Sequence, residues 1–401
     1  MEKGELPEGW EWTKLRDISE RIHYGYTASA ENKKVGPKLL RITDIQDNKV
    51  DWATVPYCPI SEEDLPNYLL KSGDLVFART GATVGKSFLI DGDIPESVFA
   101  SYLIRVILKK TVDPNFIYCF FQSPHYWNQI EKQKVGAGQE NVNSQKLSQI
   151  EIPLPPLPVQ RQIVAVLEQA EALKRQRQEA DTLTGALLKS VFYEMFGDPV
   201  RNEKGWNIVS LNEICDEMTV GVVVKPASYY VENGIPALRS LNIRQDQLDL
   251  TNLVYFSSSD NDTTLAKSKI RKGDVLVVRT GYPGTACVVP SDLDGANCID
   301  LIILRPEKKT VNCDYLSRFL NSEYGKAQAL AGNTGLAQQH LNVGAIRQVK
   351  IPLPPLALQQ QFARIVEEVE RIRERQAASG KEIEELCGGL VQRAFAGELI
   401  S

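Results

Sequence analysis

The sequence has few of the residues that build metal centres and disulfide frameworks. Its 401 residues include three histidines, and the seven cysteines are scattered without a Cys-x-x-Cys pair. Structural zinc sites and disulfide-stapled domains need such residues at close spacing. We therefore expect no metal site, and we expect buried thiols in a protein of the reducing cytoplasm.

Long hydrophobic runs are also missing. The sequence has no apolar stretch of about 18 residues, the length that a membrane-crossing helix needs, and no signal-peptide pattern opens the chain. A mean hydropathy of -0.24 and a hydrophobic content of 43% are ordinary for a folded protein with real cores. We expect a soluble, non-exported protein with no membrane partner.

An excess of positive charge is absent as well. Lysine and arginine together number 46 against 51 acidic residues, which gives a formal net charge of -5. A protein that coats nucleic acid without regard to sequence is basic throughout. This chain is not of that class, so any DNA binding has to come from local basic patches on near-neutral domains.

The most informative feature that is present is an internal repeat. Segments recur in the same order about 200 residues apart. The clearest pairs are LPEGWEWTKL (6–15) with NEKGWNIVSL (202–211), KSGDLVFARTG (71–81) with RKGDVLVVRTG (271–281), and IEIPLPPLPVQRQIVAVLE (150–168) with VKIPLPPLALQQQFARIVE (349–367). The chain is therefore one unit used twice.

Each repeat combines a globular part with a helical appendage. In the globular part, β-rich runs alternate with turn signals, and one helix is predicted near 115–132, after Pro114. The fold class is therefore α+β. The predicted divisions are a domain at 1–150, a proline-rich connector at 151–158 and a helix at 159–196, then a domain at 197–349, a connector at 350–357 and a helix at 358–401.

The I-P-L-P-P-L segments predict stiff, extended connectors, because each proline removes a backbone donor and restricts the residue before it. Each helix that follows has an apolar heptad stripe, with Leu173 and Leu187 in the first and Ile372 and Leu386 in the second. The stripes predict an antiparallel two-helix coiled coil that separates two domains related by a pseudo-two-fold axis. The alternative is that each helix packs only on its own domain.

The paired arrangement also assigns a place to the tryptophans that open each repeat. It predicts that Trp10, Trp12 and Trp206 pack beside the ends of the opposing helices, near Phe395 and Phe192. We interpret these tryptophans as packing residues.

One loop looks like a nucleotide-binding motif. GATVGKS (81–87) follows an apolar run, but its glycines are one residue too close for G-x-x-x-x-G-K-[ST]. The next residues, FLIDGDIPES, predict a strand and a turn rather than the helix whose N-terminus would hold phosphates. The matching loop of the second repeat, GYPGTAC (281–287), lacks the lysine. Nucleotide hydrolysis is therefore not expected.

These motifs together resemble the specificity (S, HsdS) subunit of Type I restriction–modification enzymes. The resemblance covers essentially the whole chain. It is carried by GWEWTKL and GWNIVSL, GDLVFARTG and GDVLVVRTG, IPLPPLPVQRQIV and IPLPPLALQQQFA, and SVFYEMFG and RAFAGEL.

The resemblance implies a DNA-binding protein that is not itself an enzyme. Each globular part is then a target-recognition domain that reads one half of an asymmetric bipartite DNA site, and the helices space the two domains. The implied partners are double-stranded DNA, two methyltransferase (modification) subunits, and restriction/translocase subunits. No cofactor is implied for this chain, and the implied location is cytoplasmic.

The chemistry of DNA read-out selects candidate contact residues. Arg pairs with guanine, Asn and Gln pair with adenine, and basic groups hold phosphates. The candidates are Tyr24, Tyr26, Arg79, Thr80, Lys86, Gln139, Asn141, Asn143 and Lys146 in the first domain, and Lys225, Arg279, Thr280, Tyr282, Gln338, Gln339 and Asn342 in the second. The competing interpretation is structural: amide-rich loops form turns, the Arg-Thr-Gly loops hold a turn or a salt bridge, and tyrosines pack.

Two other functions stay open at this point. A DNA methyltransferase with its own recognition module needs an Asn/Asp-Pro-Pro-aromatic motif, and both Pro-Pro pairs here stand between leucines. A coiled-coil adaptor that binds proteins rather than DNA would have the same helices. Salt-dependent DNA binding separates the adaptor from a DNA reader.

Overall fold

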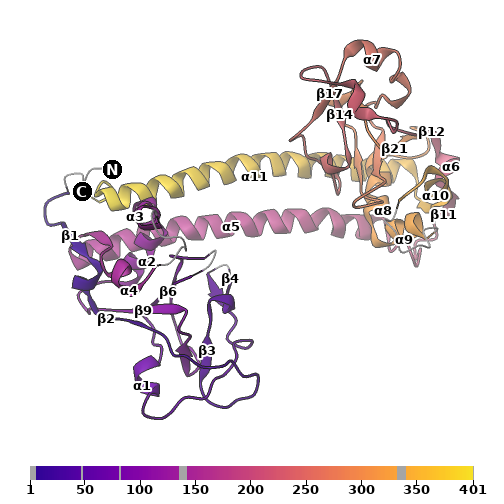
Figure 1. Cartoon of the computed structure of the whole chain (residues 1–401). Helices are drawn as coiled ribbons and strands as arrows, with labels where there is room; N and C mark the ends of the chain where they lie inside the picture. Colours follow the sequence, from indigo (N-terminus) through magenta and orange to yellow (C-terminus); the bar gives the residue numbers. More distant parts are fainter. Residues whose placement is uncertain (1–5, 47, 81–82, 135–141, 332–339, 401) are drawn as a thin grey trace. The chain divides into compact units, whose positions relative to one another are not determined.

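The computed structural model describes residues 6–46, 48–80, 83–134, 142–331 and 340–400. The chain divides into two compact units: unit 1 is Met1–Gln178 with Ala378–Ser401, and unit 2 is Glu179–Ala377. Each unit holds one globular part, called domain 1 or domain 2, and a portion of each long helix, α5 (Leu157–Phe196) and α11 (Leu356–Ala396) (Figure 1).

A four-stranded antiparallel sheet with strand order β2-β9-β6-β7 is the centre of domain 1. The middle strands read as nearly continuous apolar runs because both of their faces are covered, and every residue of β6 is buried. The strands are β2 (Ser19–Tyr24), β6 (Leu75–Ala78), β7 (Ser87–Leu89) and β9 (Leu103–Leu108). Three further pairs are β1 (Glu11–Lys14) with β10 (Glu151–Leu154), β3 (Lys38–Leu40) with β8 (Ser97–Phe99), and β4 (Ile45–Gln46) with β5 (Lys49–Val50).

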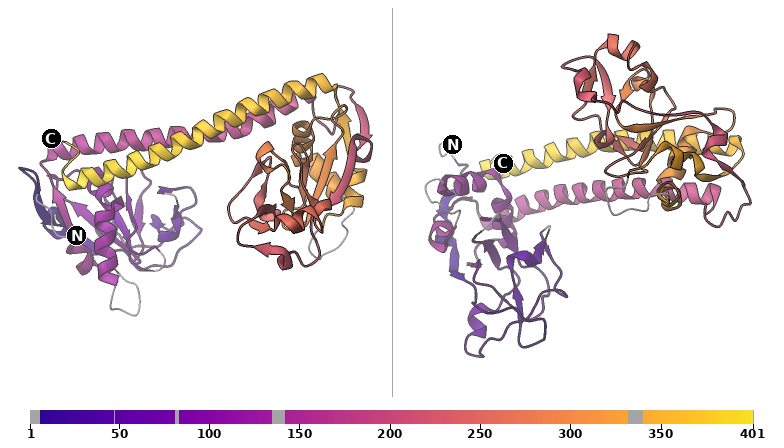
Figure 2. Two further views of the ribbon diagram at one scale, coloured as in Figure 1. Left: turned by 90° about the horizontal axis from the view of Figure 1, so that it is seen from above. Right: turned by 45° about the vertical axis from the view of Figure 1, so that its right-hand side comes forward.

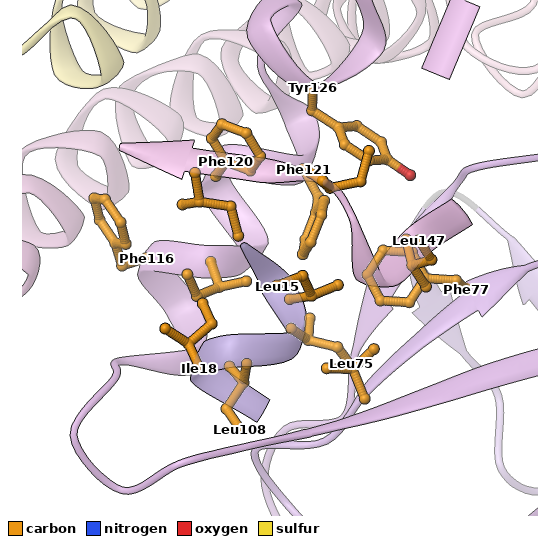
Figure 3. Close-up of a cluster of buried hydrophobic side chains, with 14 of the residues drawn as sticks. Leu15, Ile18, Leu75, Phe77, Leu108, Phe116, Phe120, Phe121, Tyr126 and Leu147 are labelled. Atoms are coloured by element: carbon orange, nitrogen blue, oxygen red, sulfur yellow. The ribbon is translucent and has the colours of Figure 1, made fainter. Parts of the chain in front are cut away.

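The core of domain 1 lies between this sheet and a helix rich in phenylalanine. Phe116, Phe120 and Phe121 are fully buried and share one cluster with Leu75 and Phe77 of β6 (Figure 3). Each buried aromatic or leucine side chain contributes about 1.5–3 kcal/mol, so this cluster supplies much of the stability of the domain. The helices of domain 1 are α1 (Leu65–Tyr68), α2 (Pro114–Gln122), α3 (Pro124–Lys134) and α4 (Ser144–Ser148).

The prediction of a single helix near 115–132 is wrong, because two helices occupy this stretch. The chain breaks at Ser123, whose backbone is extended with φ -81° and ψ 154°. The cause is Pro124, since a residue that precedes proline is pushed out of the helical region. In domain 2 the same break falls at Ser322 without a proline. There the Ser322 hydroxyl caps the new helix by accepting from Gly325 N at 3.0 Å.

Domain 2 repeats the plan of domain 1. Its central sheet has the order β12-β21-β18-β19, and the first strand carries a β-bulge between Cys215 and Glu217, where β2 has one between Ser19 and Arg21. The sheet strands are β12 (Cys215–Val220), β18 (Val275–Val278), β19 (Ala286–Val288) and β21 (Leu301–Pro306). The helices are α6 (Leu211–Ile214), α7 (Ser258–Asp262), α8 (Cys313–Asn321), α9 (Glu323–Leu330) and α10 (Val343–Gln348).

The remaining strands of domain 2 form smaller sheets around the centre. One has four strands in the order β13-β17-β14-β20, with β14 parallel to β20. The strands are β11 (Asn207–Ser210), β13 (Tyr230–Val231), β14 (Ile235–Leu238), β15 (Ile243–Arg244), β16 (Gln247–Leu248), β17 (Val254–Phe256), β20 (Asn297–Cys298) and β22 (Lys350–Leu353). The internal repeat expected from the sequence is therefore a repeat of structure.

Both long helices contribute to unit 1. Phe395, near the end of α11, is buried against α2, with ring centroids 5.4 Å from those of Phe116 and Phe120. The helices α11 and α5 also contact each other, since the Cys387 thiol of α11 lies 3.5 Å from the Ala170 carbonyl oxygen of α5. Lys174 lies 3.8 Å from Glu384, so residue numbers fall on α11 as they rise on α5. The two helices are antiparallel in unit 1, and they lie side by side there (Figure 2).

In unit 2, aromatic residues of both long helices likewise pack against the globular part. Phe192 and Phe196, at the end of α5, pack on Tyr315 of α8, with ring centroids 5.7 and 4.7 Å apart. Phe362 of α11 completes the group. The antiparallel pairing is thus confirmed within each unit, and the alternative that a helix packs only on its own domain is wrong. Trp206 packs as expected and donates from Nε1 to the Phe196 carbonyl at 2.9 Å.

The proline-rich connectors are extended at their starts, as predicted, and pair there as strands, but each long helix begins two residues earlier than expected, at Leu157 and Leu356. β10 forms an antiparallel pair with β1, and β22 forms one with β11. A buried glutamine in the first helical turn then fixes each helix to its domain. Gln160 accepts from the Asp113 amide at 2.9 Å and donates to the Pro155 carbonyl at 2.8 Å, and Gln359 makes the equivalent bonds to Asn312 and Pro354, both at 2.8 Å.

A carboxyl group where α8 meets α11 makes stability depend on pH. Burial, followed by the carboxylates of Glu367 and Asp246, raises the pKa of Asp314 to about 6. An unfolded aspartate titrates near ~3.9, so between these values the folded chain holds a proton that the unfolded chain has lost. The group therefore stabilises the fold at acid pH, and that contribution disappears as the pH rises through about 6.

We predict that Asp314→Asn removes this dependence. The variant should have a higher free energy of unfolding than the wild type at pH 7.5, because it no longer holds a charge beside two carboxylates. The difference between the two proteins should shrink as the pH falls toward 4. Urea unfolding of both proteins across this range measures the difference, and a difference that stays constant with pH would contradict the assignment.

Candidate nucleic-acid interface

The Gly-Lys-Ser loop that resembled a phosphate cradle is a β-hairpin. Ala78 N donates to the Lys86 carbonyl at 2.9 Å, and Gly85 N donates to the Ala78 carbonyl at 3.0 Å. Ser87 begins β7, so the loop leads into a strand and not into a helix. The prediction of a strand and turn after the loop is confirmed, and the arrangement that binds nucleotide phosphates is missing from this site.

In each domain this hairpin, called the RTG hairpin after its Arg-Thr-Gly sequence, meets the amide-rich segment. Val142 N donates to the Arg79 carbonyl at 3.2 Å, and Leu341 N donates to the Arg279 carbonyl at 3.0 Å. The fold thus brings together two groups of candidates that lie about 60 residues apart in the chain.

The asparagines of this junction are helix caps. The side-chain oxygen of Asn143 accepts from Lys146 N at 2.7 Å at the start of α4. Asn342 does the same for Ala345 N at 2.8 Å at the start of α10. Each cap satisfies a backbone donor that the first helical turn leaves without a partner. The side-chain oxygens of Asn143 and Asn342 are therefore occupied by capping, and their side-chain NH₂ groups take no part in the cap.

Arg279 is held by the protein on all three of its nitrogens. Nη1 donates to Asp300 at 2.6 Å, Nε donates to the Leu341 carbonyl at 3.2 Å, and Nη2 lies 2.5 Å from His340 Nε2. Thr280 adds a hydrogen bond to the second carboxylate oxygen of Asp300 at 3.3 Å. This is the salt-bridge role that the structural interpretation gave to the Arg-Thr-Gly loop.

Arg79, at the equivalent place in domain 1, lies on an aromatic ring instead. Its guanidinium carbon is 4.8 Å from the centroid of Tyr24. The Tyr24 hydroxyl accepts from Ser144 N at 3.0 Å and is 3.2 Å from the Ser144 hydroxyl. Burial acts to raise the pKa of Tyr24, but these hydrogen bonds and the Arg79 charge outweigh it and leave that pKa below its ordinary value. Tyr24 therefore anchors the junction.

The other candidates differ in how accessible they are. Lys86 is exposed at the base of the first hairpin, and Tyr282 is 82% exposed on the second. Lys225 is exposed in a left-handed backbone conformation, with φ 45°. Tyr26 packs against Tyr68 with ring centroids 5.2 Å apart. Thr80 and Lys146 are half-buried, and Gln139, Asn141, Gln338 and Gln339 lie outside the described residues.

The sequence alone did not single out several exposed side chains that neighbour the candidates Arg79 and Lys225. Tyr102, which directly precedes β9, is 64% exposed, and Val223 and Val224 after β12 are 53% and 77% exposed. Tyr102 has no counterpart in the second repeat, because Ser101 and Leu103 match the adjacent Asp300 and Leu301. Alignment of the two repeats could have singled out Tyr102, because it is an extra residue in the first repeat.

Two kinds of site are not found within the part of the chain that the structure describes. No group of three or more His, Cys, Asp or Glu residues is placed to hold a metal ion. No helix there combines the length and apolar character that crossing a membrane requires.

Comparison with known proteins assigns the family. The model of the Type I restriction modification DNA specificity domain matches the chain twice, at residues 7–180 and 203–385. The chain belongs to this family, and each of its two repeats carries one specificity domain.

Several relatives match along most of their length. The chain is 25% identical to the putative type I restriction enzyme MjaX specificity subunit of Methanocaldococcus jannaschii, over 99% of this chain and 95% of the relative. It is 25% identical to the EcoBI specificity subunit of Escherichia coli, over 92% and 81%. A solved chain from a type I restriction–modification system has the same fold, with a TM-score of 0.64 at 23% identity and coverage of 99% and 100%. The S subunit of M. genitalium gives 0.55 at 13% identity, covering 98% of each chain.

The capping role of Asn143 is testable by substitution. Asn143→Ala should lower the free energy of unfolding by about 1 kcal/mol, because α4 loses its cap. Asn143→Ser should cost only a few tenths of that, since serine also caps. Urea titration of both variants measures the two losses, and equal losses would show that the amide stabilises the junction in some other way.

Proposed function

We propose that this specificity subunit reads an asymmetric, bipartite target in double-stranded DNA, with one half-site for each domain. The observation that carries the proposal is that one scaffold occurs twice with different side chains on the matching hairpin. Lys86 and Thr285 occupy equivalent positions, since each carbonyl accepts the amide that begins the hairpin loop. Two similar readers with different contact groups favour two different half-sites.

The charge distribution fits sequence read-out better than non-specific binding. The chain has a net charge of -5, so its attraction to DNA has to be local. Exposed cations and aromatics such as Lys86, Lys225 and Tyr282 stand on loops that a rigid sheet positions. Loops on a fixed scaffold are the usual place for binding residues.

The long helices are proposed to set the distance between the half-sites and to dock two methyltransferase subunits. Support comes from apolar side chains that the seam was expected to cover. Leu173 and Leu187 on α5 are 48% and 44% exposed, and Leu386 on α11 is 52% exposed. The expectation that these side chains are buried in the seam is wrong. Exposed leucines spaced along a helix suit the apolar face of a partner helix.

The remaining activities of a restriction–modification system are assigned in this proposal to other chains. Methyl transfer belongs to the modification subunits, and translocation and cleavage belong to the restriction subunits, all in the cytoplasm. The chain itself is then not an enzyme and takes no cofactor. Methyl transfer to DNA by the purified chain alone would instead support a stand-alone methyltransferase. DNA binding that is absent, or insensitive to salt, with the modification partner present would support the adaptor.

Domain exchange tests the bipartite reading. Residues 1–150 are replaced by the corresponding domain of another specificity subunit, one chosen to keep phenylalanines at positions 116 and 120 so that Phe395 still packs. Methylome sequencing of a host that carries the exchanged subunit should show one new half-site and one unchanged half-site. A change in both halves would contradict independent reading by the two domains.

A further inference from the structure

The two RTG hairpins are closed by matching backbone hydrogen bonds, Ala78 N to the Lys86 carbonyl and Val278 N to the Thr285 carbonyl, but they differ in charge. The position of Asp300, whose amide donates to the Val222 carbonyl at 3.1 Å, corresponds to that of Ser101, whose amide donates to the Tyr26 carbonyl at 3.0 Å. The carboxylate that neutralises Arg279 is therefore replaced in domain 1 by a neutral hydroxyl.

No carboxylate therefore stands beside Arg79 at the position that Asp300 holds in domain 2. Among the described residues, the side chain of Arg79 contacts the Tyr24 ring, and no ion pair or Nη hydrogen bond joins it to any of them. Its Nε is buried without a partner. The guanidinium is nevertheless fixed in place, because it lies on the Tyr24 ring and the Tyr24 hydroxyl is bonded to Ser144.

A second cation lies on the same hairpin, and no ion pair joins it to another described residue. Lys86 is exposed, and its backbone carbonyl accepts from Ala78 N. Its equivalent in domain 2 is Thr285, which is 9% exposed and neutral. Domain 1 thus presents two cations at the hairpin, whereas the hairpin of domain 2 presents no cation that its own domain leaves unpaired among the described residues.

We infer that the RTG hairpin of domain 1 binds a DNA backbone phosphate through Arg79 and Lys86, and that the hairpin of domain 2 does not. A guanidinium held on an aromatic ring, with Nη groups that have no partner among the described residues, suits the oxygens of a phosphodiester. The inference rests on the proposed function, since it takes duplex DNA as the ligand. The two domains then differ in how they are anchored on the DNA as well as in the bases they read.

The test measures DNA affinity as a function of salt for the full chain. The probe is a fluorescent duplex of mixed sequence, because a phosphate contact does not depend on the bases. Each phosphate contact contributes about 0.9 to the slope of log K against log[salt]. Arg79→Gln should therefore reduce the slope by about 0.9, whereas Arg79→Lys, which keeps the charge, should reduce it far less.

Ser101→Asp is the most specific variant, because it copies into domain 1 the carboxylate that domain 2 already has. It should neutralise Arg79 and reduce the slope by about 0.9, while the matched control Ser101→Asn leaves the slope unchanged. Arg279→Gln should keep the wild-type slope and lower the melting temperature, since it breaks the ion pair with Asp300. Thermal unfolding of every variant identifies any loss of affinity that comes from misfolding.

The outcomes separate this inference from the function on which it rests. Suppose that the wild type binds DNA with a steep salt dependence and that both Ser101→Asp and Arg79→Gln retain the full slope. The inferred phosphate contact is then wrong, and the proposed function stands. An equal loss of slope in Arg279→Gln would also overturn the one-sided contact. If the wild type shows no salt-dependent binding, the proposed function and the inference fall together.

Discussion

The packing of each long helix into the core of the other repeat is the interaction on which the rest of the structure depends. Phe395 comes almost last in the chain, yet it is buried against Phe116 and Phe120 of domain 1. Phe192 belongs to the helix that leaves domain 1, yet it stacks on Tyr315 of domain 2. Losing a buried phenylalanine costs about 3–5 kcal/mol, a large share of the stability of an ordinary domain. Neither domain is therefore complete without a helix from both repeats.

This arrangement separates what is constant in the molecule from what varies. The sheets, the bulges, the capping asparagines and the glutamines at the helix starts recur in both units and make the same bonds. The matching surfaces differ in charge and size, as Arg79 with Ser101 and Arg279 with Asp300 illustrate. A scaffold fixed by backbone hydrogen bonds and buried aromatics lets surface residues change without altering the fold, which suits the proposed reading of two different half-sites.

Much of the fold could be predicted from the sequence because the signals were repeated. The proline segments, the heptad stripes and the duplicated β-rich runs each indicated one element twice. The prediction failed where a single residue decided the outcome, as at Pro124, which splits one expected helix. It also failed at Leu173 and Leu187, because a heptad stripe does not say which partner covers it.

The candidate site was less predictable for a physical reason. Residue type selected Arg79 and Arg279 equally, but their partners come from segments distant in the chain. Asp300 lies 21 residues from Arg279, and His340 lies 61 residues away. Only the fold shows that one guanidinium is neutralised and that the other rests on a tyrosine ring.

The most direct test of the central claim is hydrogen exchange on a chain that ends at residue 377, compared with the full chain. The account predicts that amides of α2 lose their protection, because Phe395 and its helix are missing, while amides of α8 keep theirs, since Phe192 and Phe362 are still present. Unchanged protection of α2 in the shortened chain would show that domain 1 is complete by itself and would contradict the account.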